Sequence, residues 1–245
     1  MNYKILTVLF LFSCFFSCNE KDELGELLKR AFEFKEKQNY SSALLVFKEA
    51  FEKEKKSERK AMIARNIGLI YLVKEDKTNA ELYFKKGLKF SDKSSYYHQV
   101  NEVELFLIKN NSELAKRKLL EMRNSFADSM EVYQMLSFIY SGSYNENDED
   151  LDLSLENALI AYKINANVVN TDQLASIYFL MDKYEEAASL FVKLKQQFPE
   201  NKRYQFDYGQ SLYFNGKEKE GLKEMQEAAE RDSECKNRLN EIISE

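Results

Sequence analysis

Few side chains in this sequence are of a type and spacing that could carry out acid–base, nucleophilic or metal chemistry. There is one histidine, His98, and neither a cysteine nor a second histidine lies near it in sequence. Metal sites and histidine-based triads need such residues in combination, so we expect His98 to be structural. Carboxylates are plentiful, but lysines alternate with them, which is typical of solvated helix faces. The sequence therefore predicts no enzyme, no metal site and no cofactor.

The stretch over residues 141–150 is the one candidate for calcium binding, because it is rich in Asp, Glu and Asn. A calcium loop of the EF-hand type needs oxygen ligands at alternating positions, a central glycine and a closing glutamate. This stretch lacks that order. We expect a solvated surface insertion.

The N-terminus differs in kind from the rest of the chain. Lys4 supplies a positive charge, and residues 5–16 are almost wholly apolar before Ser17 and Cys18. An apolar run this short does not span a bilayer as a helix, which takes about 20 residues. Residues 1–17 therefore indicate a secretory signal peptide.

Ser17 and Cys18 resemble the lipobox of bacterial lipoproteins, in which the cysteine carries acyl chains such as palmitate and becomes the first mature residue. Cys14 offers a second match, but it would leave a very short signal, so we favour lipidation of Cys18. A cleaved signal without lipidation and an uncleaved membrane tether are the alternatives. Residues 18–23 then form the lipidated cysteine and a short acidic tether. With Cys18 acylated and Cys14 removed, Cys235 is alone and no internal disulfide forms.

Small residues recur at one position through the rest of the chain. Their separations are 37, 35, 39, 33 and 34 residues, which is the period of an internal helical repeat. With one proline and seven glycines, the chain suits a helical structure nearly throughout. The residues at this position are Ala43, Ala80, Ala115, Ser154, Ala187 and Gly221.

The clearest repeat contains Ile67, Gly68 and Tyr71 on one helix and Ala80 and Phe84 on a second, with a polar turn and helix N-cap expected at residues 77–79. This order and spacing resemble a tetratricopeptide repeat. The resemblance implies an all-α, right-handed solenoid of about six helix-turn-helix repeats over residues 24–245. The repeats are expected at 24–57, 61–94, 96–129, 130–167, 168–201 and 202–235, with a capping helix at 236–245.

In tetratricopeptide-repeat proteins the first helix of each repeat lines a concave groove. The corresponding positions here carry many aromatic and few like-charged side chains, which favours an apolar or amphipathic peptide. They do not resemble the carboxylate clamp of some relatives, since Leu28 and Phe32 stand where lysine and asparagine are wanted. The expected groove residues are Phe32, Arg65, Leu69, Glu104, Phe138, Asp172, Phe179, Phe206, Gln210 and Tyr213.

The sequence therefore predicts a membrane-anchored scaffold of the bacterial cell envelope that binds protein partners, similar to lipoproteins that assist envelope assembly. We expect an outer-membrane lipoprotein that faces the periplasm. The alternative is a surface-exposed lipoprotein that contacts host or environmental ligands, favoured only by the likeness of Lys21, Asp22 and Glu23 to a surface-export signal. With 41 acidic and 36 basic residues, the chain lacks the basic excess of nucleic-acid-binding proteins. We expect no small-molecule substrate.

The lipidation prediction is tested by replacing Cys18 with alanine. Loss of the acyl chains removes most of the apolar surface that holds the chain to a bilayer. We expect Cys18→Ala to move the protein out of the membrane fraction and to change its electrophoretic mobility, whereas Cys235→Ala changes neither. An unchanged membrane fraction and mobility for Cys18→Ala contradicts the prediction.

Overall fold

The computed structural model describes residues 23–244, which fold into two compact units that meet in sequence at Asn111 and Ser112. The predicted signal peptide, Cys14, Cys18 and most of the acidic tether lie outside the described residues. All regular secondary structure within residues 23–244 is helical. Every helix there is too short or too polar to cross a membrane.

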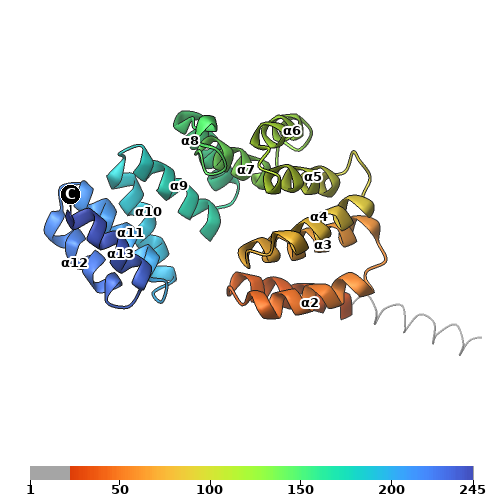
Figure 1. The fold of residues 1–245 in the computed structure, drawn as a ribbon, viewed down its shortest axis with the longest axis horizontal. Helices are drawn as coiled ribbons and strands as arrows, with labels where there is room; N and C mark the ends of the chain where they lie inside the picture. The colour runs from red at the N-terminus through yellow and green to blue at the C-terminus, as the bar shows by residue number, and fades with distance from the viewer. Residues whose placement is uncertain (1–22, 245) are drawn as a thin grey trace, which may run out of the picture. The chain divides into compact units, whose positions relative to one another are not determined.

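The first unit consists of successive antiparallel helices (Figure 1). A helix over residues 23–36 comes first, and four labelled helices follow it. These are α2 (Tyr40–Lys53), α3 (Ser57–Val73), α4 (Lys77–Lys89) and α5 (Tyr96–Ile108).

The second unit repeats the arrangement of paired helices (Figure 1). Its last helix begins three residues before the predicted cap at 236–245, and the predicted repeat at 96–129 is divided between the two units. The helices are α6 (Ser112–Ser125), α7 (Met130–Tyr140), α8 (Leu151–Ile164), α9 (Val168–Leu180), α10 (Tyr184–Gln197), α11 (Lys202–Phe214), α12 (Glu218–Ala229) and α13 (Ser233–Ser244), with a short 3₁₀ helix η1 (Glu146–Asp148) between α7 and α8.

The turns within the regular helix pairs share one geometry. One residue of each turn has a left-handed backbone, and the N–H of the next residue donates to a carbonyl five positions earlier, as from Asp76 to Tyr71 at 2.9 Å. This is the Schellman ending of a helix. The left-handed residues are Gln38, Glu75, Asn110, Asp182 and Gly216.

The expected turn and cap at residues 77–79 were placed slightly too late. Helix α4 already begins at Lys77, and the side chain of Asp76 accepts a hydrogen bond from the Asn79 N–H at 3.0 Å. Asp76 is therefore the N-cap that satisfies an otherwise unpaired donor of the first helical turn.

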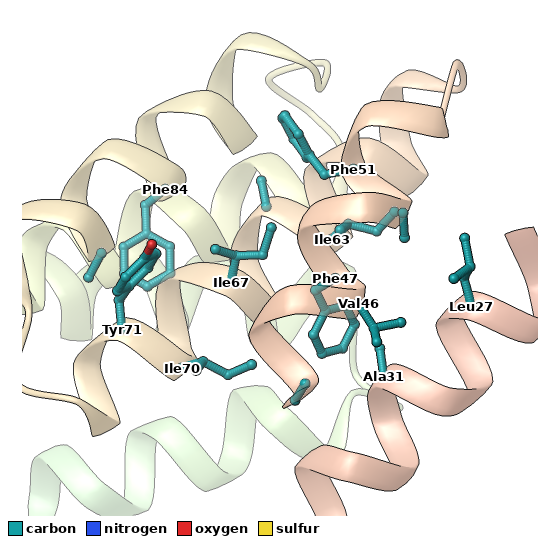
Figure 2. Close-up of a cluster of buried hydrophobic side chains, with 14 of the residues drawn as sticks. Leu27, Ala31, Val46, Phe47, Phe51, Ile63, Ile67, Ile70, Tyr71 and Phe84 are labelled. Atoms are coloured by element: carbon teal, nitrogen blue, oxygen red, sulfur yellow. The ribbon is translucent and has the colours of Figure 1, made fainter. Parts of the chain in front are cut away.

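The small residues of the repeat lie where two helices come closest. A Cβ placed on Gly68 would lie 2.5 Å from the ring of Phe84, so the aromatic ring fills the space that the glycine leaves. Ile67, Tyr71 and Phe84 belong to the buried cluster of the first unit (Figure 2). The small residue beside large apolar ones thus sets how near α3 and α4 approach.

In the second unit, the position that corresponds to Gly68 brings the backbone of one helix against the backbone of the next. A Cβ on Gly209 would lie 2.8 Å from the Gly221 carbonyl oxygen and 2.9 Å from the Met225 nitrogen. In the pair α7 and α8, Ser137 and Ser154 occupy the two positions, and each hydroxyl donates to the other residue's carbonyl oxygen at 2.9 Å.

The loop over residues 141–150 is only partly the solvated insertion that the sequence predicts. Residues 143–147 are exposed, but the side chain of Asp148 is 7% exposed and its Oδ1 lies 2.8 Å from Lys116 Nζ on α6. Hydrogen bonds from Lys116 lower the pKa of Asp148, and the same pairing raises the pKa of Lys116 to about 12. Within residues 23–244 no group of three or more His, Cys, Asp or Glu side chains is placed to hold a metal ion.

The tight contact at Gly209 gives a stability prediction with an internal control. Gly209→Ala puts a methyl group against backbone atoms that cannot rotate away, so we expect a loss of about 1–3 kcal/mol through overpacking. Gly25 lies in the helix over residues 23–36 with no atom near its hypothetical Cβ. Gly25→Ala should therefore stabilise by up to ~1 kcal/mol through helix propensity. Chemical denaturation followed by circular dichroism measures both, and equal effects would contradict the prediction.

Candidate functional site

The expected groove residues of the first unit are mostly engaged in packing. Arg65 on α3 and Glu104 on α5 form an ion pair, with Nη2 and Oε1 2.7 Å apart and side chains 7% and 6% exposed. Phe32 packs edge-on against Phe47, and Leu69 packs against the apolar core. The expectation that Arg65 and Glu104 line an open surface is therefore wrong, because the two buried charges satisfy each other.

The second unit contains a pocket that includes expected groove residues. Its volume is about 300 Å³, at the small end of the range for ligand sites. Phe179 and Gln210 were predicted from the sequence, and the charged residues of the pocket were not. The lining residues are Ser176, Phe179 and Leu180 from α9, Phe191 from α10, Arg203, Asp207 and Gln210 from α11, and Arg238 from α13.

The charged residues form a connected network across three helices. The Arg203 guanidinium is bonded to Asp172 on α9 and lies 3.4 Å from Asp207 Oδ2. Arg238 Nη2 donates to Asp207 Oδ1 and to Gln210 Oε1, both at 2.8 Å. Asp207 is thus held by two guanidinium groups, and Asp172 by one.

Burial dominates the electrostatics of both carboxyl groups. Loss of hydration raises the pKa of Asp207 and of Asp172, although the neighbouring arginines act in the opposite direction. Desolvation lowers the pKa of Arg203, but its two carboxylate neighbours outweigh that effect and raise it overall. Arg203 therefore remains charged, and the ion pairs with arginine partly offset the cost of burying the two carboxyl groups.

Aromatic rings flank the apolar side of the pocket. Phe179 lies edge-on to both Tyr184 and Phe214, at centroid distances of 5.3 and 5.9 Å, and Tyr184 stacks on Phe214 at 5.5 Å. Leu180 is 54% exposed and Phe214 is 44% exposed. Large apolar side chains left open beside a pocket are typical of contact surfaces.

The remaining predicted residues take different positions. Phe206 is fully buried in the core beneath Arg238, whose guanidinium lies 4.4 Å from the ring centroid, so its expected place on the groove surface is wrong. Tyr213 is half-buried and meets Phe214 edge-on, and Phe138 on α7 is half-buried. Asp172 does not line the pocket but is the ion-pair partner of Arg203, which does.

The sequence did contain a partial signal for the charged pocket residues that were not predicted. Arg203, Asp207 and Gln210 recur at i, i+4 and i+7, so they share one face of a helix. Arg238 carried no such signal, because its partner Asp207 lies 31 residues away. The terminal helix was expected only to end the stack, yet it supplies one wall of the pocket.

The environments of the single histidine, His98, and of Cys235 are typical of structural residues. His98 Nδ1 lies 3.1 Å from the Ser91 carbonyl oxygen and 3.3 Å from the Ser91 hydroxyl, at the start of α5. Cys235 is buried with Phe206 and Met225, and burial raises the pKa of its thiol to about 11. A thiol with this pKa is almost wholly protonated at neutral pH and is a poor nucleophile.

The buried pair in the first unit predicts a non-additive effect on stability. Glu104→Leu leaves the Arg65 charge buried without its carboxylate, so we expect a loss of about 3–5 kcal/mol. The double variant Arg65→Met with Glu104→Leu should recover most of that loss, because apolar side chains replace both charges. Denaturation midpoints of the single and double variants test this. Glu81→Gln, at an exposed pair with Lys85, is the control and should change little.

Equal losses in the single and double variants would contradict this account of the Arg65–Glu104 pair.

Comparison with solved structures identifies the fold. A structure of Pseudomonas aeruginosa pilF is 13% identical, with 91% of this chain and 99% of that chain covered at a TM-score of 0.57. TTC0263, a thermophilic TPR protein of Thermus thermophilus, is 15% identical, with 76% of this chain and 100% of that chain covered at a TM-score of 0.58. YrrB, described as a TPR protein with an unusual peptide-binding site, is 17% identical, with 76% of this chain and 92% of that chain covered at a TM-score of 0.50.

No protein-family model and no curated protein matches the sequence. At these identities the likeness to solved structures concerns the fold. The paired helices, their small residues at the points of closest approach and the likeness to these structures together establish that the chain has the all-α, solenoid-type fold of tetratricopeptide-repeat proteins.

Proposed function

We propose that this protein is a lipid-anchored interaction scaffold of the bacterial cell envelope and that its second unit holds a segment of a partner protein. The observation that carries the proposal is the pocket beside Phe179, where apolar side chains from two helices stand next to exposed Leu180 and Phe214. Aromatic rings of this kind supply large contact area at low conformational cost, so they serve as anchors in protein interfaces.

The fold supports a role in binding. Stacked helix pairs present long surfaces built from successive first helices, and such surfaces bind extended or helical peptides. YrrB, which shares the fold, is described as having a peptide-binding site. For this chain we propose an apolar or amphipathic segment as the occupant.

The anchoring part of the proposal rests on the sequence. The apolar N-terminus followed by Cys18 resembles a lipoprotein signal, and the charged residues after it resemble a tether. Acylation at Cys18 would keep the folded units at a membrane surface. We propose that this surface is the periplasmic face of the outer membrane, where the partner is another envelope protein.

Site-specific photo-crosslinking in living cells tests the proposed pocket. A benzoyl-phenylalanine at Phe179 keeps an aromatic ring in the pocket, and a second variant carries it at the exposed Leu180. Lys193 on α10 is the control, because it is exposed on a helix of the same pair and does not line the pocket. We expect both pocket positions to capture the same discrete protein and Lys193 to capture none.

Two results would overturn the proposal. The first is the same set of adducts from Lys193 as from the pocket positions, which would mean random encounter. The second is the absence of adducts from both Phe179 and Leu180, which would mean that these side chains serve packing alone.

A further inference from the structure

Basic side chains outnumber acidic ones among the residues that line the pocket of the second unit. Two arginines, Arg203 and Arg238, line it together with one carboxylate, Asp207. The second carboxylate of the network, Asp172, stands outside the lining and is bonded to Arg203. With Asp172 counted, the network holds two arginines and two carboxylates, so its formal charge is balanced, in a chain whose formal net charge is −5.

Both guanidinium groups keep donor capacity for a ligand. An arginine has five N–H donors in a fixed fork. The contacts of Arg238 with Asp207 and Gln210 both use Nη2. The side chains of Arg203 and Arg238 are 40% and 31% exposed, so a ligand in the pocket can reach them.

The two arginines are also held in place before any ligand arrives. The Arg238 guanidinium lies over the ring of Phe206 at 4.4 Å, and that of Arg203 lies over the ring of Tyr204 at 4.7 Å. Asp207, which contacts both, is buried. Because rings and carboxylates fix the two forks, a ligand that binds them pays little for ordering these side chains.

Apolar walls stand beside the charged ones within the same pocket of about 300 Å³. Phe179, Leu180 and Phe191 come from α9 and α10, and the arginines come from α11 and α13. An occupant that satisfies both walls has a carboxylate close to apolar side chains. In a helical peptide, residues three or four positions apart share a face, so one acidic side chain among apolar ones meets this requirement.

We infer that the pocket selects a partner segment in which an Asp or Glu side chain lies among apolar side chains, with the carboxylate bonded to Arg203 and Arg238 and the apolar neighbours against Phe179 and Leu180. The inference rests on the proposed function, that this pocket holds a segment of a partner protein. It adds that the partner segment must carry a carboxylate, which a purely apolar groove would not require.

Peptide selection on the full chain in detergent tests the inference without knowledge of the partner. The probe is a phage library of random dodecapeptides joined to the coat protein by their C-termini, so that no peptide has a free terminal carboxylate. A second library displays free C-termini. We expect the first library to enrich peptides with an internal Asp or Glu flanked by leucine, isoleucine or phenylalanine.

The contribution of the carboxylate is then measured on synthetic peptides with amidated C-termini. Charge-assisted hydrogen bonds contribute roughly 1.5–3 kcal/mol, so replacing the acid by its amide should weaken binding roughly 10- to 100-fold. The protein is unchanged in this comparison, so no folding defect can affect it.

A matched pair of protein variants locates the effect. Arg203→Gln leaves Asp207 paired with Arg238, and circular dichroism checks that it folds. Lys236→Gln removes the same charge from an exposed position of α13 outside the pocket. We expect Arg203→Gln to weaken the acidic peptide and to leave the amide peptide nearly unaffected, and Lys236→Gln to affect neither.

The possible outcomes separate the two proposals. Enriched apolar peptides without an acid would overturn the inference and leave the proposed function standing. Enrichment from the free C-terminus library alone would also overturn it, since the carboxylate would then come from a chain end. Failure of both libraries to enrich any peptide would count against the inference and the proposed function together.

Discussion

The contact on which the rest of the structure depends is the close approach of the two helices in each pair at one position. Where α11 crosses α12, Gly209 and Gly221 let backbone meet backbone. Ser137 and Ser154 reach a similar approach by bonding to each other's carbonyl groups. Because backbone atoms set the distance at this contact, the large apolar side chains around it must pack to fit a fixed spacing of the two helices.

A second set of contacts joins first helices of successive repeats within each unit, and these contacts are polar. Lys35 bonds to Asn66, and Arg65 to Glu104, in the first unit. Gln173 bonds to the Gln134 carbonyl in the second unit, where the series continues in the arginines of the pocket. The first helices are therefore linked by directed bonds on the same side from which a groove would be formed.

The period of small residues was enough to predict the helix pairs, because steric fit at a crossing depends on residue size, which the sequence states directly. The turns were harder to place. Their left-handed positions are held by Gln38, Glu75, Asn110 and Asp182 as well as by Gly142 and Gly216, so no single residue type marks them. The Schellman bonds stabilise the left-handed backbone even at Gln38 and Glu75, whose residue type does not favour it.

The candidate site was the least predictable part. Exposure of a first-helix residue depends on what the next repeat places against it, and those partners are 31 to 39 residues away. Phe206 and Arg65 look alike as groove positions in the sequence. Phe206 is covered by Arg238, and Arg65 is paired with Glu104. Both are therefore buried through contacts that the local sequence pattern does not show.

The arginines of the pocket and the Arg65–Glu104 pair differ in how completely neighbouring side chains cover them. Arg65 and Glu104 join α3 to α5, and the packing around them leaves both side chains nearly inaccessible. α13 is the last described helix, and its buried side, with Cys235 and Leu239, covers the Phe206 cluster. Arg238 lies beside that buried side and remains 31% exposed. The helix that closes the core thus presents a charged group to solvent, and the ion pairs that elsewhere only join repeats become available to a ligand.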